Sequence, residues 1–166
     1  YGMAWRAHAH RYGTTREEVS AIVLKNKRNG QKNPLAQMKR PVSSEDILQS
    51  PLISDPLRLF DCCPTTDGAS ALVLVASDHL ERKDAANIEI LASVQTRGAA
   101  RLAGHADLCS FNATVEAGRR AFETAGIAPP DLDFVELHDC FSIAEALDTE
   151  DLGLVPRGQG ARWAAE

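Results

Sequence analysis

The chain has 166 residues, a length that suits one ordinary globular domain and is too short for two complete ones. Hydrophobic residues make up 44% and charged residues 25% of the sequence, which argues against the disordered, collagen-like and coiled-coil classes. The net charge of -5 argues against a general nucleic-acid binder, because no cationic excess can neutralise phosphates, and no apolar run approaches the roughly 18 residues of a membrane span.

Helices are predicted in the first part of the chain. Residues 1–12 have helix-forming content and are followed by Gly13, a residue suited to the left-handed backbone that ends a helix. Thr15 and Glu18 have the spacing of a capping box. A second helix is therefore expected from Thr15 until the Asn-Gly pair at 29–30 closes it.

Three apolar segments bounded by turn or linker residues predict buried strands. They are residues 69–76, 88–95 and 134–137. A helix is expected to begin at Asn112 or Thr114 and to end at Gly126, with shorter helices over 45–49 and 142–147. The order of strand, helix and strand is βαβ-like, and the low aromatic content of 5% favours helix-on-sheet layers. The predicted fold class is therefore α/β.

One basic stretch stands out in this acidic chain. Between positions 25 and 40, six basic residues occur without any acidic one: Lys25, Lys27, Arg28, Lys32, Lys39 and Arg40. We call these six residues the basic island. Two interpretations are open, a solvated helix and loop face or a docking surface for a small polyanion such as a nucleotide phosphate.

The four cysteines predict neither a zinc site nor a disulfide framework, because no CxxC pair occurs among them. They are Cys62, Cys63, Cys109 and Cys140. No metal site is predicted, and a reducing cytoplasm is the expected compartment. Neighbouring cysteines cannot form an unstrained disulfide, so core packing is the expected role of the pair at 62 and 63.

His138, Asp139 and Cys140 lie together where a predicted strand meets a predicted helix, the place at which ligands bind in α/β sheets. Three roles are open for this group. Cys140 could be a nucleophile activated by His138, His138 could donate a hydrogen bond to a carbonyl or position a water, or the group could be structural. The acidic residues that follow are expected on a solvated helix face: Glu145, Asp148, Glu150 and Asp151.

Two separated motifs resemble segments of the thiolase superfamily. Residues 55–74, DPLRLFDCCPTTDGASALVL, are similar to the segment that closes the amino-terminal half of a thiolase. Residues 117–141, AGRRAFETAGIAPPDLDFVELHDCF, resemble the start of the carboxyl-terminal half. Many thiolases carry Asn-Glu-Ala-Phe where this chain has HDCF at 138–141. The HDCF variant resembles the sterol-carrier-protein type and its bacterial and archaeal lipid-transfer relatives.

The resemblance implies a layered thiolase-like fold of mixed sheets with helices between and around them, incomplete in this chain. Residues 1–80 would end the amino-terminal half, including a loop-domain segment, and residues 86–166 would start the carboxyl-terminal half. The implied activity is Claisen condensation or thiolytic cleavage of acyl-CoA thioesters, with coenzyme A as substrate and no separate cofactor. His138 would help build the oxyanion hole for the thioester enolate, usually through a water, a contribution on the order of 3 kcal/mol. The basic island would lie near the CoA phosphates.

The resemblance also implies that other parts of a thiolase active site lie outside this chain. The nucleophilic cysteine belongs before Tyr1, and the Gly-His-Pro and Cys-x-Gly motifs belong after Glu166. We therefore expect an interior segment that is inactive alone, from an enzyme that forms a homodimer or homotetramer.

Two alternatives to a thiolase remain open. The superfamily includes retro-aldolases that shorten steroid side chains as CoA thioesters and work with an OB-fold, zinc-ribbon protein partner. The other alternative is a non-catalytic thiolase-fold subunit that binds CoA or scaffolds a partner. The histidine at position 138 favours thiolase-like chemistry.

Overall fold

The computed structural model describes residues 1–79 and 88–165. Its helices are α1 (Gly2–Tyr12), α2 (Arg16–Lys32), α3 (Ser44–Gln49), α4 (Asn112–Ala125), α5 (Ser142–Asp151) and α6 (Gly160–Trp163). Two short strands, β1 (Leu52–Ser54) and β2 (Leu57–Arg58), form an antiparallel pair in which Leu52 lies opposite Arg58. Within the described ranges, no helix is both long and apolar enough to cross a membrane.

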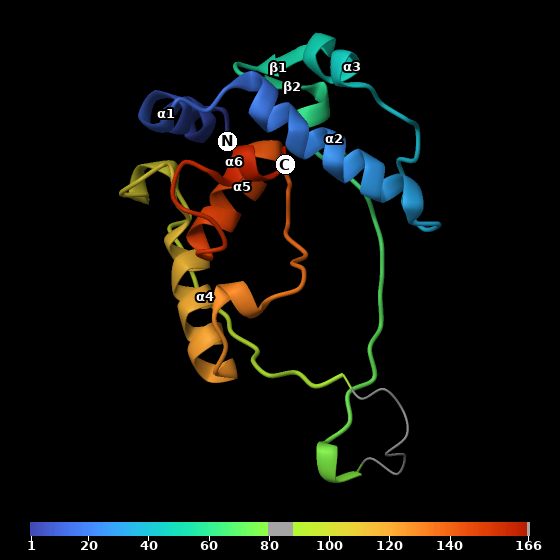
Figure 1. Ribbon diagram of the computed structural model, residues 1–166, viewed down its shortest axis with the longest axis vertical. Coiled ribbons are helices and arrows are strands. Elements are labelled where there is room, and N and C mark those ends of the chain that lie inside the picture. Colours follow the sequence, from blue (N-terminus) through green and yellow to red (C-terminus); the bar gives the residue numbers. More distant parts are fainter. Residues whose placement is uncertain (80–87, 166) are drawn as a thin grey trace.

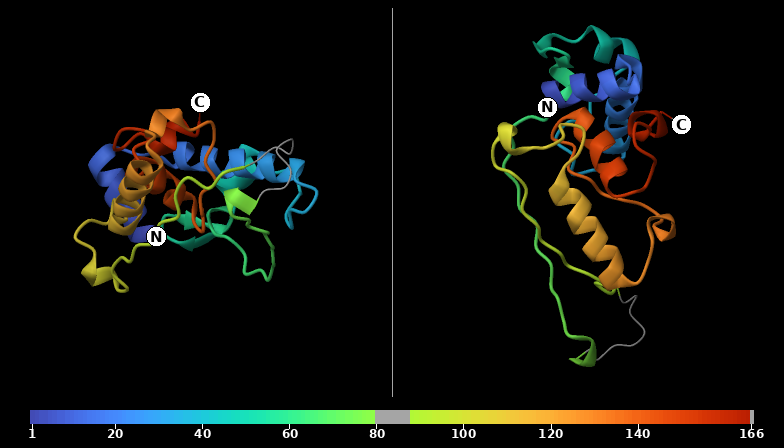
Figure 2. Two further views of the ribbon diagram at one scale, coloured as in Figure 1. Left: turned by 90° about the horizontal axis from the view of Figure 1, so that it is seen from below. Right: turned by 90° about the vertical axis from the view of Figure 1, so that its left-hand side faces the viewer.

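The first and last parts of the chain pack together into a helical body (Figure 1). α2 contacts α3, α5 and α6, and the β1–β2 pair lies beside α3. α4 packs against α5 and extends away from this body. Residues 64–76 and 88–98 run away from the body and back to it as long unpaired segments, which Figure 2 shows from two further directions.

Local signals set most of the helix ends. Gly13, with a φ of 75°, ends α1, and the Thr15 and Glu18 capping box begins α2, so both predictions are confirmed. The predicted end of the second helix is wrong, because α2 passes through Gly30 and continues to Lys32. A glycine inside a helix costs only about 1 kcal/mol relative to alanine, which the rest of the helix offsets. The predicted helices at α3, α4 and α5 are confirmed, and α5 is longer than expected.

The core is built around α5. Its residues Ile143, Ala146 and Leu147 are completely buried, in one cluster with Val19 and Ile22 of α2. Burial of one such isoleucine or leucine side chain contributes about 1.5–3 kcal/mol. The apolar face of α5 therefore packs against α2 and holds the first and last parts of the chain together.

The three predicted strands do not form in the described residues. Segments 69–76, 88–95 and 134–137 have no strand partner there, and their apolar side chains are largely exposed: Val73 keeps 91% and Ile88 94% of its accessible surface. A strand is held by hydrogen bonds to a neighbouring strand, and the described chain supplies no neighbour at these places. The predicted βαβ unit is absent from the described residues for the same reason.

Candidate active-site loop and clefts

The loop at residues 134–141 leads into α5 and carries the predicted site group. Its end is held by the segment that follows β2, because Phe141 forms an antiparallel bridge with Cys62. The Cys63 N–H also donates to the Cys140 carbonyl at 3.1 Å. These contacts give the end of the loop a fixed register.

Asp61, a buried residue just before this bridge, fixes the start of α5. Its Oδ1 accepts a hydrogen bond from Ser142 Oγ at 2.7 Å. Its Oδ2 accepts one from the Arg58 N–H at 2.7 Å and one from Arg16 Nη1 at 2.5 Å. The Arg16 guanidinium lies over the Trp5 ring, 4.9 Å from its centre. One carboxylate thus joins α2, the end of β2 and the first turn of α5.

Asn26 connects α2 to the loop and to α5. Its Nδ2 donates to Asp139 Oδ2 at 2.7 Å and to Glu145 Oε2 at 2.6 Å. Lys25 Nζ lies 2.7 Å from Glu145 Oε1 and donates to Asn26 Oδ1 at 2.7 Å. Sequence reasoning missed Asn26, whose one signal is its place inside the basic stretch. The network ties the beginning of the basic island to the loop.

A wide cleft opens beside this network. It has a volume of about 540 Å³ and lies between α2, the loop and α6. Lys25 and Asn26 line it on one side, Leu137 and Asp139 on another, and Trp163 on the third. Such a mixture of apolar and convergent polar side chains is typical of small-molecule sites.

The structure brings half of the basic island together. Lys25, Arg28 and Lys32 are spaced three and four positions apart, so they lie along one face of α2. All three line a second cleft, of about 380 Å³, together with Trp163. We call these three residues the cationic face. Cations gathered in this way can act on one anion.

The other half of the basic island lies elsewhere. Lys27 Nζ lies 5.7 Å from the centre of the Phe60 ring and lines a third cleft, of about 320 Å³. Lys39 donates to the Pro34 carbonyl, and Arg40 is exposed in the loop after α2. These three cations therefore do not line the second cleft with the cationic face.

His138 is exposed and lies between two residues that line the 540 Å³ cleft, Leu137 and Asp139. Its charge acts on the α5 side of the loop. Burial raises the pKa of Asp148 to about 6, while a hydrogen bond from Thr114 and the charge of His138 oppose that rise. Within the described residues, no hydrogen bond or ion pair joins His138 to the basic island.

Known proteins are similar in sequence to nearly the whole chain. The family model described as "Thiolase C-terminal domain-like" matches residues 95–166. An acetyl-CoA acetyltransferase of Methanothermobacter thermautotrophicus is 41% identical over 162 residues, which is 98% of this chain and 42% of that protein. The chain belongs to the thiolase superfamily. Sterol carrier protein 2 of Bos taurus is 36% identical over 98% of this chain and 31% of that protein.

The fold comparison agrees with the sequence. The structure of the Ltp2-ChsH2(DUF35) aldolase matches with a TM-score of 0.82 and 25% identity, over 99% of this chain and 44% of that one. The chain thus spans less than half the length of these relatives. The predicted thiolase-like fold is confirmed even though its strands are unpaired here. The TM-score compares the path of the backbone, and extended segments can follow the same path without hydrogen-bonded neighbouring strands.

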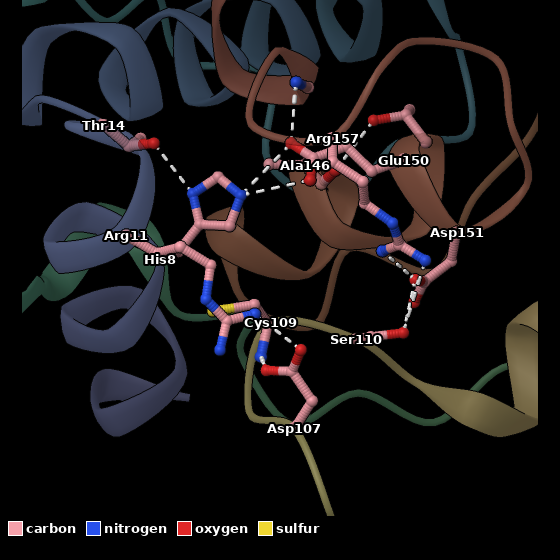
Figure 3. A network of polar contacts seen from close by, with 12 residues as sticks. His8, Arg11, Thr14, Asp107, Cys109, Ser110, Ala146, Glu150, Asp151 and Arg157 are labelled. Atoms are coloured by element: carbon pink, nitrogen blue, oxygen red, sulfur yellow. Dashed lines mark hydrogen bonds and ion pairs between the residues drawn. The ribbon is translucent and has the colours of Figure 1, made fainter.

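In this thiolase-superfamily chain the acidic residues of α5 are mostly buried, so the prediction of a solvated acidic face is wrong. Glu150 accepts hydrogen bonds from His8 Nε2 at 3.1 Å and from the Gly160 N–H at 2.9 Å (Figure 3). Burial by itself raises the pKa of Glu150, but these donors outweigh it and hold the pKa below its usual value. Asp151 accepts from Ser110 Oγ at 2.7 Å. Donors from distant segments therefore offset the desolvation of these carboxylates.

The cysteines are all free. Cys62 is half-buried and Cys63 is exposed, so the expectation of core packing is wrong for Cys63. The part of the chain that the structure describes holds no group of three or more His, Cys, Asp or Glu side chains arranged to bind a metal. Cys140 lies at the end of the loop, where its carbonyl accepts a hydrogen bond from the Cys63 N–H.

Proposed function

We propose that the chain is a segment of an acyl-CoA thiolase, which catalyses Claisen condensation or thiolytic cleavage of CoA thioesters. The observation that carries the proposal is the 41% identity, over 98% of the chain, to a protein named acetyl-CoA acetyltransferase. A benzoylsuccinyl-CoA thiolase subunit of Thauera aromatica, 34% identical over 98% of the chain, also supports it. Both names describe chemistry on CoA thioesters.

In this proposal His138 donates, through a water, to the thioester oxygen as enolate charge develops. Its exposure supports the role, because a substrate outside the helical body can reach it. The bridge between Phe141 and Cys62 supports it as well, since a donor on a fixed loop end needs little reorganisation during the reaction. The nucleophile belongs to another part of the enzyme, so the segment alone is expected to be inactive.

The proposal assigns the CoA phosphates to the cationic face. CoA carries a diphosphate and a ribose phosphate, and several cations on one helix face match that charge. Trp163 is 49% exposed in the same cleft and offers its ring to the adenine. Lys25 is already paired with Glu145, so Arg28 and Lys32 are expected to contribute most of the binding.

Titration calorimetry of coenzyme A with the 166-residue chain tests this assignment. The double variant Arg28→Glu/Lys32→Glu should weaken binding at least about tenfold, because attraction to the phosphates becomes repulsion. Lys39→Glu/Arg40→Glu is the matched control: it changes the net charge equally but outside the second cleft, and should leave the Kd nearly unchanged. Equal weakening in both variants would contradict the assignment. Absence of CoA binding by the unmodified chain would favour a scaffolding subunit.

A CoA-thioester retro-aldolase is the second candidate, because the matched solved structure is that of an aldolase. The two reactions differ in what happens to the thioester. A Claisen condensation joins two thioesters and releases one CoA thiol, whereas retro-aldol cleavage breaks a carbon–carbon bond and leaves the thioester intact. Release of free thiol by the longer polypeptide that carries this segment would favour the thiolase. A requirement for an OB-fold, zinc-ribbon protein would favour the aldolase.

A further inference from the structure

Two cysteines face each other where the segment after β2 meets the start of α5. The bridge that pairs Cys62 with Phe141 is antiparallel, so Cys63 stands directly opposite Cys140. The Cys63 N–H donates to the Cys140 carbonyl at 3.1 Å, which fixes this register. Directly opposite residues of an antiparallel pair place their side chains on one face. In such antiparallel pairs the Cα atoms are generally about 4.5–5.5 Å apart, within the range of about 4.4–6.8 Å found in disulfides.

The surroundings distinguish this pair from the other two cysteines. Cys63 is exposed and Cys140 is half-buried, so a small oxidant can reach the pair. Cys62 belongs to the neighbouring position and therefore points to the opposite face, where its thiol donates to the Arg58 carbonyl at 3.4 Å. Cys109 is only 2% exposed, inside the core.

Tyr1 gives a second indication that the two thiols are close. Its ring stacks on Phe141 with the ring centres 4.4 Å apart. The pKa of Tyr1 is raised to about 12. The largest cause is a hydrogen bond with the Cys140 side chain, burial is the next, and Cys63 also contributes. Both cysteines therefore affect the ionisation of one phenol.

We propose that Cys63 and Cys140 form a reversible disulfide on reaction with hydrogen peroxide. The exposed Cys63 thiol reacts first: its sulfur takes one oxygen as the O–O bond breaks, which gives a sulfenic acid and one water. The Cys140 sulfur then attacks the Cys63 sulfur. The S–S bond forms, the S–O bond breaks, and the hydroxide leaves with the Cys140 proton as a second water. An excess of a small thiol reverses the reaction by exchange.

The disulfide acts on the loop that carries the candidate site. It ties the segment after β2 to Cys140. The neighbouring residue, Asp139, lines both the 540 Å³ and the 320 Å³ clefts. Oxidation therefore prevents the loop end from separating from the body and holds those clefts in one shape. The inference is independent of the proposed function, because it depends on the backbone register and not on any substrate.

Peptide mass spectrometry of the chain after treatment with hydrogen peroxide tests the proposal. The expected product is an intramolecular cross-link between Cys63 and Cys140 that disappears on reduction with dithiothreitol. Cys63→Ser and Cys140→Ser should each abolish it. Cys62→Ser and Cys109→Ser are the matched controls and should leave it unchanged. Oxidation should also raise the midpoint of thermal unfolding by about 5 °C or more in the unmodified chain, but not in Cys63→Ser.

Three outcomes would overturn the proposal. One is a cross-link between Cys62 and Cys140 as the main product. Another is sulfinic acid at Cys63 without any cross-link. The third is a link that forms only between two molecules, which a dependence on protein concentration would reveal. Because Cys63 is exposed, Cys63→Ser is expected to fold, and its circular dichroism spectrum checks that directly.

Discussion

Replacing Asp61 with alanine should destabilise the fold strongly, because one buried carboxylate serves three donors. It accepts from Arg16 at 2.5 Å, from the Arg58 N–H at 2.7 Å and from Ser142 Oγ at 2.7 Å. These donors come from α2, β2 and α5, so the substitution disconnects the two ends of the helical body at one point. In the described part of the chain, Arg16 Nη1 and Ser142 Oγ have no other acceptor.

The expected cost follows from the burial of the two charges. Removing one partner of a buried ion pair costs about 3–5 kcal/mol. The lower end applies here, because Arg16 keeps 20% of its side chain exposed and stays over the ring of Trp5. The lost acceptor of Ser142 adds about 1 kcal/mol. Asp61→Ala should therefore lower the free energy of unfolding by about 4 kcal/mol, a large part of the roughly 5–15 kcal/mol that stabilises a domain.

Urea unfolding followed by tryptophan fluorescence measures this cost. Arg6→Ala is the control, since its ion pair with Asp55 is exposed on both sides and should contribute less than about 1 kcal/mol. The double variant Arg16→Met/Asp61→Leu should be more stable than Asp61→Ala, because it removes both charges instead of leaving one unpaired. If Asp61→Ala costs no more than Arg6→Ala, the reasoning about buried charge is refuted.

Two further predictions concern the loop and its neighbour on α5. Burial raises the pKa of Asp148 from 3.8 to about 6. Between these pH values the folded chain keeps a proton that the unfolded chain has lost, so the free energy of unfolding should fall as pH rises from about 4 to about 6. Asp148→Asn should remove that fall, a gain of about 1–2 kcal/mol at pH 7 once partial exposure is allowed for, and identical urea curves at pH 7 would contradict it. His138→Ala, made in the proposed longer thiolase polypeptide, should lower turnover about 100-fold without changing the free energy of unfolding, and unchanged turnover would exclude the oxyanion role.

The helices were predictable because their signals are local. The capping box of Thr15 and Glu18 acts over three residues, and the left-handed Gly13 and Gly126 each end a helix within one residue. These contacts join residues only a few positions apart in the sequence. The end of α2 was mispredicted because Asn29-Gly30 is only a weak helix breaker when neighbouring turns continue the hydrogen bonding.

The strands were not predictable in the same way, because a strand is a property of two segments. The apolar run at 69–76 has the pattern of a buried strand, yet Leu72 is 86% exposed in the structure. The apolar pattern indicates which side chains a segment can bury, but burial also requires a neighbouring strand that packs beside it. The thiolase-like path of the chain is retained, as the TM-score of 0.82 shows, without the pairing.

The prediction of a solvated face for the acidic residues of α5 failed for a related reason. Charged residues on a helix usually face water, but Glu145 meets Asn26 and Glu150 meets His8, partners from α2 and α1. A single sequence does not reveal that such distant donors converge on one helix. The same limit explains why Asn26 was missed, since its importance lies in the three groups that it contacts rather than in any motif.

The loop that carries His138 is fixed at one end and open at the other, which links stability to the proposed chemistry. Phe141 is held by its bridge to Cys62 and the next residue by Asp61, whereas Phe134 is 80% exposed. His138 lies three positions before Phe141, so the anchored end limits its reach to about 10 Å. Asp61 is therefore a positioning residue for His138 as well as a stabilising one. In the proposed longer thiolase, Asp61→Asn should lower turnover more than it lowers CoA affinity, because it loosens the loop without touching the cationic face.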